Sequence, residues 1–427
     1  MSHTQTVMRR KQIVLLVPTT TYRLGDFLQA AARLEIDVIL ASNRCHVLAA
    51  EWPEHFGLSL PFSSLPDAVD KAHAALRDKT IDAIVAADDY TTVLAAMLAE
   101  KLHLPSNRHD SVEKTRNKLS MRRALTDGGL LSPNFFAIKI DSPPEACLPK
   151  VEFPVVLKPL LLSGSRGVIR ANTAVEFVAA FHRIAALLRD REFFQMRRAA
   201  AKRILIESYI PGDEVAVEGL LTNGKLRVLA IFDKPDPLEG PFFEETIYVT
   251  PSRLSPETQN QIHDVVSDAC KILGLQHGPI HAEARLNEQG VFILEVAART
   301  IGGLCSRTLK FGAGLSLEEL VLRHAVGENV DEITRLTDAA GVMMLPIPRS
   351  GRLHNVEGIA AAAAVPFIQD LKITISPDNL VVALPEGASY LGFMFARAET
   401  PEQVESALRE AHRKLHFDIQ PALAVRE

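Results

Sequence analysis

The stretch that most constrains this chain is HAEARLNEQGVFILEVAARTIGG, residues 281–303. Two apolar-rich segments joined by a short turn at 287–290 predict a β-hairpin. Each segment carries one carboxylate, Glu283 or Glu295, and side chains alternate between the two faces of a strand, so both can lie on one face. Because Mg²⁺ prefers hard oxygen ligands, this geometry predicts a magnesium site. The alternative is an amphipathic hairpin whose acidic side chains are simply solvated.

Length and charge restrict the class of protein. A chain of 427 residues exceeds what one hydrophobic core usually supports, so we expect two or three domains. The formal charge of -5 is mild and provides no large basic field for nucleic acid or anionic lipid. The apolar run IVLLV before Pro18 is too short for a signal segment or a membrane span. We therefore expect a soluble protein with neither nucleic-acid nor membrane partners.

The cysteines are scattered along the chain. Cys45, Cys147, Cys270 and Cys305 lack the CxxC spacing of a zinc site and do not form a disulfide framework. This pattern favours a reducing, cytoplasmic environment.

The first region, residues 1–107, alternates short β-branched runs with helical segments such as 24–34. This alternation predicts βαβ units and a small doubly wound parallel sheet. The GxGxxG fingerprint is absent after the first strand, which argues against a dinucleotide-binding oxidoreductase. Asp88 and Asp89 end a strand on the side where such sheets bind ligands, although acids also commonly cap the following helix.

The remaining chain predicts two further units of mixed structure. Residues 108–330 combine helices with antiparallel hairpins that are broken by the turn signals Pro211-Gly212 and Asn223-Gly224. Residues 331–427 form a third, α+β unit. The expected helices lie in SVEKTRNKLSMRRAL and at 177–203, 257–273 and 400–415, and ITISPDNLVVALPEG is expected to be a hairpin.

A strand followed by a glycine-serine loop is the second chemical feature. In VVLKPLLLSGSRGV, Lys158 ends a buried-looking strand, and Ser163-Gly164-Ser165-Arg166-Gly167 follows. Glycines let backbone N–H groups turn toward an anion, serines add hydroxyl donors, and lysine adds positive charge. The sequence is not a Walker loop. Lys118 on the preceding basic helix could be a second phosphate contact; an ordinary hairpin loop is the alternative.

A third feature is ILIESYIPGDEVAVEG, where a strand carrying Glu207 leads into Tyr209 and Ile210 and then to Glu214. Such a hinge can offer backbone groups and an apolar lining to an adenine, with an acid for ribose hydroxyls. A plain hairpin with solvated acids is the alternative reading.

The order of these motifs resembles the ATP-grasp superfamily over residues 108–325, and the first region resembles the domain that usually precedes that fold. The resemblance implies ATP as cofactor, with Mg²⁺ or possibly Mn²⁺. It implies that Lys118, Lys158 and the loop contacts Ser163, Gly164, Ser165 and Gly167 bind phosphates, that Glu207, Tyr209 and Ile210 hold adenine and Glu214 the ribose, and that Glu283 and Glu295 carry the metal.

One position departs from the superfamily pattern. The superfamily often has Asn two residues after the second metal carboxylate, and here that residue is Ala297. Arg299 stands where the superfamily has its substrate arginine, and its guanidinium fork suits a carboxylate, an acyl phosphate or a tetrahedral oxyanion. With Lys158 it is the expected catalytic residue.

The third region resembles the C-terminal part of bacterial L-amino-acid ligases, in VEGIAAAAAVPFI and YLGFMFARAETPEQVESALREAHRKL. The resemblance implies an ADP-forming carbon–nitrogen ligase that joins an amino-acid carboxylate to an amine through an acyl phosphate, and it implies a homodimer. Small carboxylate and amine substrates are the expected partners.

Further residues are assigned to the substrate. The loop PFFEETIYVTPS is a candidate cover, in which Phe242 and Phe243 shield the site and Glu245 holds an ammonium group. Gly302 and Gly303 join Arg299 in the expected substrate set. A solvated loop is the alternative, and His277 and His281 are expected to be packed histidines rather than bases.

Other readings of the whole chain stay open. It could be another ATP-grasp enzyme, such as a biotin-carboxylase-like or glycinamide-ribonucleotide-synthetase-like protein. It could also be a non-catalytic ATP-binding module, which Ala297 supports and the retained lysines, acids and arginine oppose.

Overall fold

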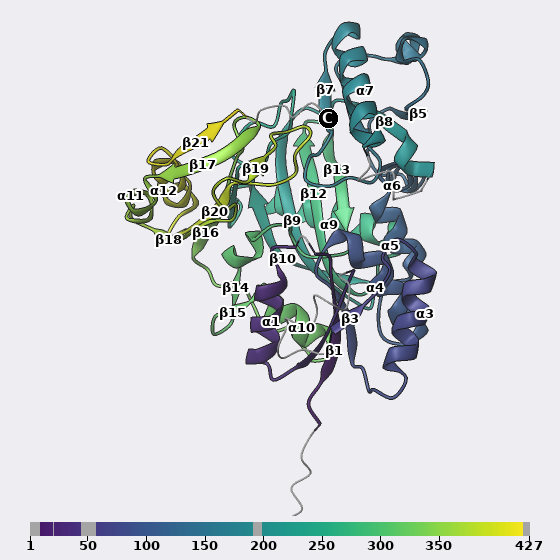
Figure 1. The fold of residues 1–427 in the computed structure, drawn as a ribbon, viewed down its shortest axis with the longest axis vertical. Coiled ribbons are helices and arrows are strands. Elements are labelled where there is room, and N and C mark those ends of the chain that lie inside the picture. The colour runs from purple at the N-terminus through teal and green to yellow at the C-terminus, as the bar shows by residue number, and fades with distance from the viewer. Residues whose placement is uncertain (1–8, 20, 44–56, 191–198, 422–427) are drawn as a thin grey trace, which may run out of the picture.

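The computed structural model of the chain describes residues 9–19, 21–43, 57–190 and 199–421. Figure 1 shows the N-terminal region at the bottom, a small teal unit at the top and the C-terminal region at the left, all around one large sheet. The expected fold class is confirmed: a parallel-sheet domain is followed by a larger domain built on antiparallel sheets.

The N-terminal region is a four-stranded parallel sheet with the order β3-β2-β1-β4. Alternation decides its two faces: Ile13 and Leu15 join one buried cluster, and Val14 and Leu16 join another. Its strands are β1 (Gln12–Val17), β2 (Asp37–Ser42), β3 (Gly57–Ser59) and β4 (Ala83–Ala86). Its helices are α1 (Leu24–Arg33), α3 (Leu65–Leu76) and α4 (Asp89–Lys101).

The predicted basic helix is two helices, α5 (His109–Arg116) and α6 (Lys118–Asp127). Asn117 separates them with extended backbone (φ −116°, ψ 104°), and its side-chain oxygen accepts hydrogen bonds from two N–H groups that begin α6. Asparagine favours this N-cap position because it satisfies donors that have no partner within the helix. The break places Lys118 at the first residue of α6.

A small antiparallel sheet with the order β5-β8-β6-β7 carries the glycine-serine loop between β6 and β7. The predicted helix at 177–203 is wrong at its C-terminal end, because α7 ends at Arg189 and Arg203 begins a strand; residues 191–198 lie outside the described chain. The elements are β5 (Phe135–Lys139), η1 (Pro144–Lys150), β6 (Val155–Pro159), β7 (Ile169–Ala171), α7 (Ala174–Arg189), η2 (Ala199–Lys202) and β8 (Arg203–Ser208).

The central sheet has eight strands in the order β13-β12-β9-β10-β11-β16-β20-β18. The two turn signals of the middle region are confirmed, since one precedes β9 and the other joins β9 to β10. The strands are β9 (Asp213–Thr222), β10 (Lys225–Asp233), β11 (Ile247–Thr250), β12 (Gly278–Asn287), β13 (Gly290–Ala297), β16 (Ala339–Leu345), β18 (Ile368–Ile373) and β20 (Gly392–Ala398).

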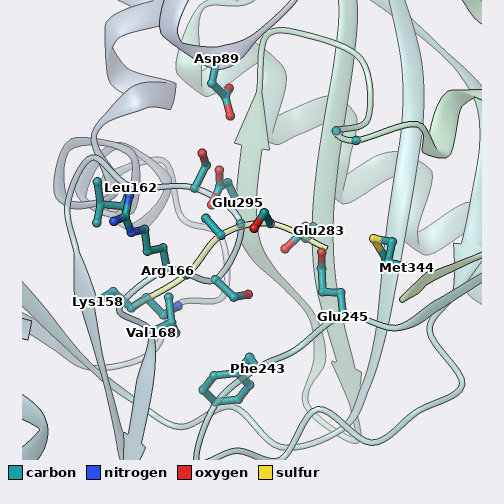
Figure 2. Close-up of a pocket in the computed structure, with 18 of the residues that line it drawn as sticks. Asp89, Lys158, Leu162, Arg166, Val168, Phe243, Glu245, Glu283, Glu295 and Met344 are labelled. Carbon is teal, nitrogen blue, oxygen red and sulfur yellow. The ribbon is translucent and has the colours of Figure 1, made fainter. Parts of the chain in front are cut away.

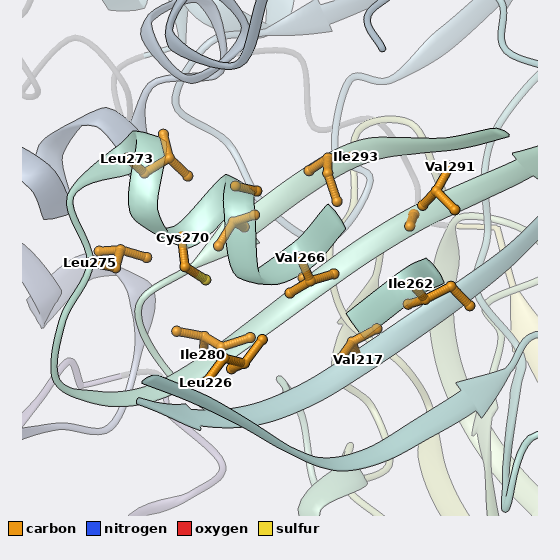
Figure 3. Packing of buried hydrophobic residues seen from close by; sticks show 14 of the residues in the cluster. Val217, Leu226, Ile262, Val266, Cys270, Leu273, Leu275, Ile280, Val291 and Ile293 are labelled. Carbon is orange, nitrogen blue, oxygen red and sulfur yellow. The ribbon is translucent and has the colours of Figure 1, made fainter. Parts of the chain in front are cut away.

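Helix α9 (Pro256–Leu273) covers one face of this sheet, as predicted (Figure 3). Ile262, Val266 and Cys270 recur every four residues, so they share one face of the helix and pack against strand residues such as Ile280. Each fully buried aliphatic side chain of this kind contributes about 1.5–3 kcal/mol. The packing fixes the β12–β13 hairpin against a rigid support.

The opposite face is covered by elements that follow the hairpin: η3 (Cys305–Thr308), β14 (Lys310–Phe311), β15 (Leu315–Ser316) and α10 (Leu317–Ala325). Helix α10 also packs on the N-terminal sheet, where Leu322 and Val326 join the cluster of Ile13 and Leu15. The N-terminal region is thereby fixed to the central sheet.

The C-terminal region adds strands to the central sheet and has a small sheet of its own, β19-β17-β21. The predicted hairpin in ITISPDNLVVALPEG is wrong, because β18 pairs with β20 and β19 pairs with β17 in different sheets. The predicted last helix is confirmed with a shorter end. The elements are β17 (Gly351–Glu357), α11 (Ile359–Ala363), β19 (Leu380–Val381), α12 (Pro401–His412) and β21 (His416–Gln420).

The domain limits 1–107, 108–330 and 331–427 stay a prediction, and the central sheet crosses the second of them through the β11–β16 pairing. Among the described residues, no helix is both long enough and apolar enough to cross a membrane.

Candidate active site

A cavity of about 920 Å³ lies where the N-terminal sheet, the small sheet, the central sheet and the C-terminal region meet. Every residue that the sequence assigned to the site lines this cavity, except Gly167 and Phe242. Figure 2 shows Lys158 and Arg166 on one side and the carboxylates of Glu283, Glu295 and Glu245 on the other. The structure therefore brings the separate sequence motifs into one space.

The phosphate loop, Ser163–Gly167, connects β6 to β7. Gly164, Ser165 and Gly167 all have positive φ values, of 63°, 54° and 71°. This left-handed region is strained for a serine and tolerated by glycine, and successive residues in such conformations can turn backbone N–H groups toward an anion. The geometry supports the phosphate-binding interpretation.

Lys158 is held by a carboxylate rather than exposed to solvent. Its Nζ lies 2.6 Å from Glu207 Oε2, and Arg122 Nε donates to Glu207 Oε1 at 2.7 Å. Burial raises the pKa of Glu207, but the two cations more than offset burial and lower it to about 2. The Glu207 side chain, assigned to adenine by the sequence, thus positions Lys158, the lysine that the sequence assigned to phosphates.

Arg122 is a functional-site neighbour that the sequence did not single out. It is 1% exposed, and its Nη1 donates to the Ile293 carbonyl at 2.8 Å. A buried arginine must be paired, so it ties α6 to both Glu207 and β13. Only its position on a helix otherwise rich in surface cations could have suggested this role.

Lys118 lies between the phosphate loop and the hairpin. Its Nζ donates to the Leu162 carbonyl at 2.8 Å and pairs with Glu295 Oε2 at 2.9 Å. The lysine therefore reaches the side of the loop where phosphates are expected.

Glu283 and Glu295 pair across the β12–β13 hairpin and so lie on one face, as predicted, but a register shift between Glu283 and Ala284 that was not predicted brings them opposite each other. A second arrangement was not predicted: ligand oxygens of Glu214, Glu245 and Glu283 lie within 4.8 Å of one another. Three carboxylates from β9, the 234–246 loop and β12 offer hard oxygen ligands that fit Mg²⁺. Glu245 comes from the expected cover loop, which is half-buried rather than exposed.

Lys234 occupies the middle of this carboxylate group and was missed by the sequence. Its Nζ lies 2.7 Å from Glu214, 2.5 Å from Glu245 and 3.6 Å from Glu283. Burial lowers the pKa of Lys234, but the three carboxylates together raise it well above its usual value. Lysine balances the acids and limits how many of them are free to bind a metal at once.

The ribose assignment of Glu214 meets a different environment. One of its oxygens accepts from Lys234, and the other accepts from Arg285 Nε at 2.8 Å. Arg285 also donates to the Ile210 carbonyl at 2.7 Å and lies 5.2 Å from the centre of the Tyr209 ring. Arg285 therefore fixes the segment that was assigned to adenine.

His281 is a packed histidine, as expected. It is 6% exposed, and its Nδ1 lies 3.0 Å from Glu218 Oε2. Burial lowers its pKa, but hydrogen bonds to Glu218 and Glu283 raise it to about 9. Ala297 lies opposite His281 in the hairpin register, so the position of the usual Asn neighbours the buried His281 ring.

Arg299 pairs with a residue of the N-terminal region. Its Nη2 donates to Asp89 Oδ2 at 2.8 Å, and Arg116 lies 3.5 Å from the other Asp89 oxygen. Burial raises the pKa of Asp89, but the two arginines hold it well below its usual range. The neighbouring Asp88 caps α4 by accepting from the Tyr90 N–H, so the capping alternative is confirmed for Asp88.

Gly302 and Gly303 line the cavity directly after Arg299. Gly303 has a φ of 58°, and a Cβ there would lie 2.8 Å from the Phe393 ring, so only glycine fits. The C-terminal region also contributes lining that the sequence did not predict, including Met344, Leu380 and the segment 386–390.

The comparisons with known families match this geometry region by region. Residues 28–106 match the ATP-grasp N-terminal domain, residues 151–308 match the ATP-grasp domain, and residues 343–420 match L-amino acid ligase C-terminal domain 2.

The chain belongs to the ATP-grasp superfamily.

It is an ATP-grasp carbon–nitrogen ligase of the ADP-forming type, with L-amino acid ligases among its relatives. Dapdiamide A synthase of Enterobacter agglomerans is 24% identical over 77% of this chain and 73% of that protein. Alanine–anticapsin ligase of Bacillus subtilis (strain 168) is 27% identical over 56% of this chain and 53% of that protein. The crystal structure of L-amino acid ligase from Bacillus licheniformis has a TM-score of 0.78 and 26% identity, and the match covers 97% of this chain and 100% of that one.

Proposed function

We propose that this ATP-grasp ligase joins the carboxylate of one amino acid to the amine of a second amino acid or a related amine. The carboxylate attacks the γ-phosphate of ATP to give an acyl phosphate and ADP. The amine then attacks the acyl carbon, and phosphate leaves as the amide forms. The observation that carries this proposal is the single cavity in which the phosphate loop, two lysines, a carboxylate group and Arg299 converge.

The nucleotide end of the cavity is assigned to the small sheet. Lys158 and Lys118 offset the negative charge of the phosphates, and the phosphate loop supplies backbone N–H and serine hydroxyl donors. Glu207 and Arg122 hold Lys158 in position, so little reorganisation is needed when the nucleotide binds.

The carboxylates would hold the metal. Glu283, Glu245 and Glu214 are grouped tightly enough to bind one Mg²⁺, and Glu295 faces the same cavity. Bound Mg²⁺ would neutralise phosphate charge.

The acyl end of the cavity is assigned to Arg299. Its guanidinium is already oriented by Asp89, which leaves a fixed cation beside the site where negative charge develops on the acyl phosphate and on the tetrahedral oxygen. Phe243, Tyr248 and Tyr390 line the same cavity and exclude water, which would otherwise hydrolyse the acyl phosphate.

The experiment is a screen of ADP release over pairs of amino acids, with product mass measured for each active pair. A ligase releases ADP much faster when both substrates are present than with the carboxylate alone, and the product has the combined mass minus one water. ADP release without an amide product would favour another ATP-grasp chemistry. ATP binding without ADP release under any pair would favour a non-catalytic module.

The homodimer is part of the same proposal. Light scattering on the purified protein tests it, and a monomeric mass at working concentration would reject it.

A further inference from the structure

The C-terminal segment 382–390 connects β19 to β20 and forms one wall of the cavity. It also lies directly against the phosphate loop. The Gly167 N–H donates to the Pro385 carbonyl at 2.8 Å, and Arg166 Nε donates to the Glu386 carbonyl at 2.6 Å. A residue outside the small sheet therefore fixes the position of the loop that the sequence assigned to phosphate.

The Glu386 side chain adds an ion pair to these backbone contacts. Arg183, on α7 of the small-sheet unit, donates Nε to Oε1 at 2.5 Å and Nη2 to Oε2 at 2.8 Å. The guanidinium of Arg183 also lies 5.1 Å from the centre of the Phe242 ring, in the half-buried cover loop. Three segments that surround the cavity thus meet at one arginine.

We propose that Glu386 is a positioning residue: its backbone carbonyl holds Arg166 of the phosphate loop and its carboxylate holds Arg183 of α7, so that the phosphate loop stays closed over the nucleotide. This inference rests on the proposed function, because it takes the nucleotide to bind at the phosphate loop. Arg166, Arg183 and Glu386 are not catalytic residues. Glu386 affects the reaction only through the phosphate loop that it holds.

The solvent exposure of the Arg183–Glu386 ion pair allows it to break in each catalytic cycle. The side chains of Arg183 and Glu386 are 46% and 39% exposed, and ion pairs at this exposure contribute little net stability. A weak, bidentate contact holds a defined geometry and still breaks readily. A lid of this kind lets nucleotide enter and leave, and in the closed state it keeps water from the acyl phosphate.

The first experiment uses Glu386→Gln, Arg183→Gln and the double variant. We expect each single change to raise KM for MgATP about two- to fivefold, the range set by exposed ion pairs, with kcat less affected. The double variant should be no worse than either single one. ADP released per amide formed should rise above the wild-type ratio. Unchanged KM and an unchanged ratio would overturn the proposal.

The exchanged pair Glu386→Arg with Arg183→Glu adds a test of charge complementarity. Restored KM in that variant supports a direct contact. Failure of the exchange to improve on Glu386→Arg alone counts against it.

The second experiment tests whether the phosphate loop must move away from segment 382–390 for nucleotide to exchange. A Cβ on Gly164 would lie 3.7 Å from Ala388 Cβ, within the Cβ–Cβ range of a disulfide, about 3.5–4.5 Å. We expect Gly164→Cys with Ala388→Cys to form this bond on oxidation and to lose nucleotide exchange until a thiol reductant is added. Gly164→Cys alone controls for strain at its positive φ and for the native cysteines.

Two outcomes contradict the proposal in this experiment: no crosslink under oxidation, or exchange at the same rate with and without the crosslink. Exchange is followed with a fluorescent ATP analogue, so it is independent of amide formation. Wild-type protein that exchanges nucleotide but makes no amide would reject the ligase reaction alone. The crosslink would still decide whether the loop opens, and the affinity of the Glu386 and Arg183 variants for the fluorescent ATP analogue would still decide the role of Glu386.

Discussion

Arg299 and Asp89 are 210 residues apart in the chain, and their guanidinium and carboxylate groups meet at 2.8 Å in the wall of the cavity. Asp89 begins α4 of the N-terminal region, whereas Arg299 follows β13 of the central sheet. The pairing means that the N-terminal region orients the cation assigned to the acyl group. The N-terminal region is thus part of the site and not only an attached domain.

The first prediction follows from that pair. Arg299→Lys keeps the positive charge but loses the fork that binds Asp89 and an oxyanion together. We expect amide formation to fall about 10²–10³-fold, the usual cost of one lost oxyanion donor, with little change in MgATP affinity. Product mass and nucleotide binding measure the two effects separately. ATP affinity that falls together with turnover would assign Arg299 to the nucleotide, and unchanged product formation would exclude it from the site.

The second prediction concerns the metal. Glu283→Gln keeps the size of the side chain but removes a charge from the group of three carboxylates. We expect a higher Mg²⁺ requirement for turnover, because an amide is a much weaker ligand for a hard cation. Activity measured against Mg²⁺ concentration reports this. Glu239→Gln, in the same loop as Glu245 but exposed, is the matched control. An identical Mg²⁺ curve for both variants would make the hairpin structural.

The third prediction concerns the binding of ATP phosphates by Lys158. Lys158→Ala removes a cation that lies 2.6 Å from Glu207, and Arg122 still neutralises that carboxylate. We therefore expect weaker ATP binding and loss of turnover with the fold retained, as measured by calorimetry and circular dichroism. Lys139→Ala, at the exposed end of β5, should behave like wild type. Full activity in the Lys158 variant would remove the nucleotide assignment.

The fourth prediction concerns stability. Arg122→Met leaves the buried Glu207 carboxylate with Lys158 as its remaining cation. The Ile293 carbonyl also loses the hydrogen bond that Arg122 donates. Breaking a buried ion pair by removing one partner typically costs about 3–5 kcal/mol, so the free energy of unfolding in urea should fall by that order. The neighbouring Arg123 is exposed, and Arg123→Met should change it by about 0.5 kcal/mol or less. Equal effects of the two substitutions would contradict the buried network.

The fifth prediction concerns pH. His324 packs against His277 with ring centroids 4.5 Å apart, and its Nε2 lies 3.0 Å from Thr222 Oγ1. Burial first, and then His277 and Arg227, lower the pKa of His324 from 6.5 to about 4, while Asp331 opposes them. Between these two pH values, His324 is therefore neutral in the folded protein and protonated in the unfolded chain.

The sign of the effect follows from proton uptake. Between pH 6.5 and about 4 the unfolded chain binds a proton that the folded chain does not, so the free energy of unfolding falls as pH falls through this window. Above pH 6.5, His324 is neutral in both states and does not make the free energy of unfolding depend on pH. His324→Gln should flatten this part of the stability curve, whereas His263→Gln, at an exposed position on α9, should not. Parallel curves for wild type and the His324 variant would contradict the prediction.

Much of the fold was predictable because its signals are local. The short apolar, β-branched runs QIVLLV and IDVILAS predict the N-terminal strands, and the helix predicted at 257–273 is α9. The hairpin itself follows from a short turn between two apolar segments, but Glu283 faces Glu295 only because the register shifts by one residue between Glu283 and Ala284. The errors are local too: Asn117 was read as helix interior rather than as the cap that it is.

The unpredicted parts of the site depend on contacts between distant segments. Lys234 and Arg122 look in the sequence like ordinary charged residues, and only the fold shows that each is buried against an opposite charge. Asp89 was noted at the ligand-binding side of the N-terminal sheet, but its pairing with Arg299 was not predicted. No spacing rule relates Lys234 to Glu283, since they meet through the pairing of β9 with both β10 and β12. No sequence motif marked the C-terminal residues that line the cavity.

The continuity of the central sheet limits how such an enzyme can be re-engineered. A chimaera that replaced residues 331–427 with those of a relative would exchange three of the eight strands, β16, β20 and β18. The graft would have to reproduce the β16 edge that pairs with β11 over four residues, and also the segment that touches the phosphate loop. A crossover after β16 would instead divide the β16–β20 pairing, which spans seven residues, so the four-residue β11–β16 boundary is the smaller interface for a graft to match.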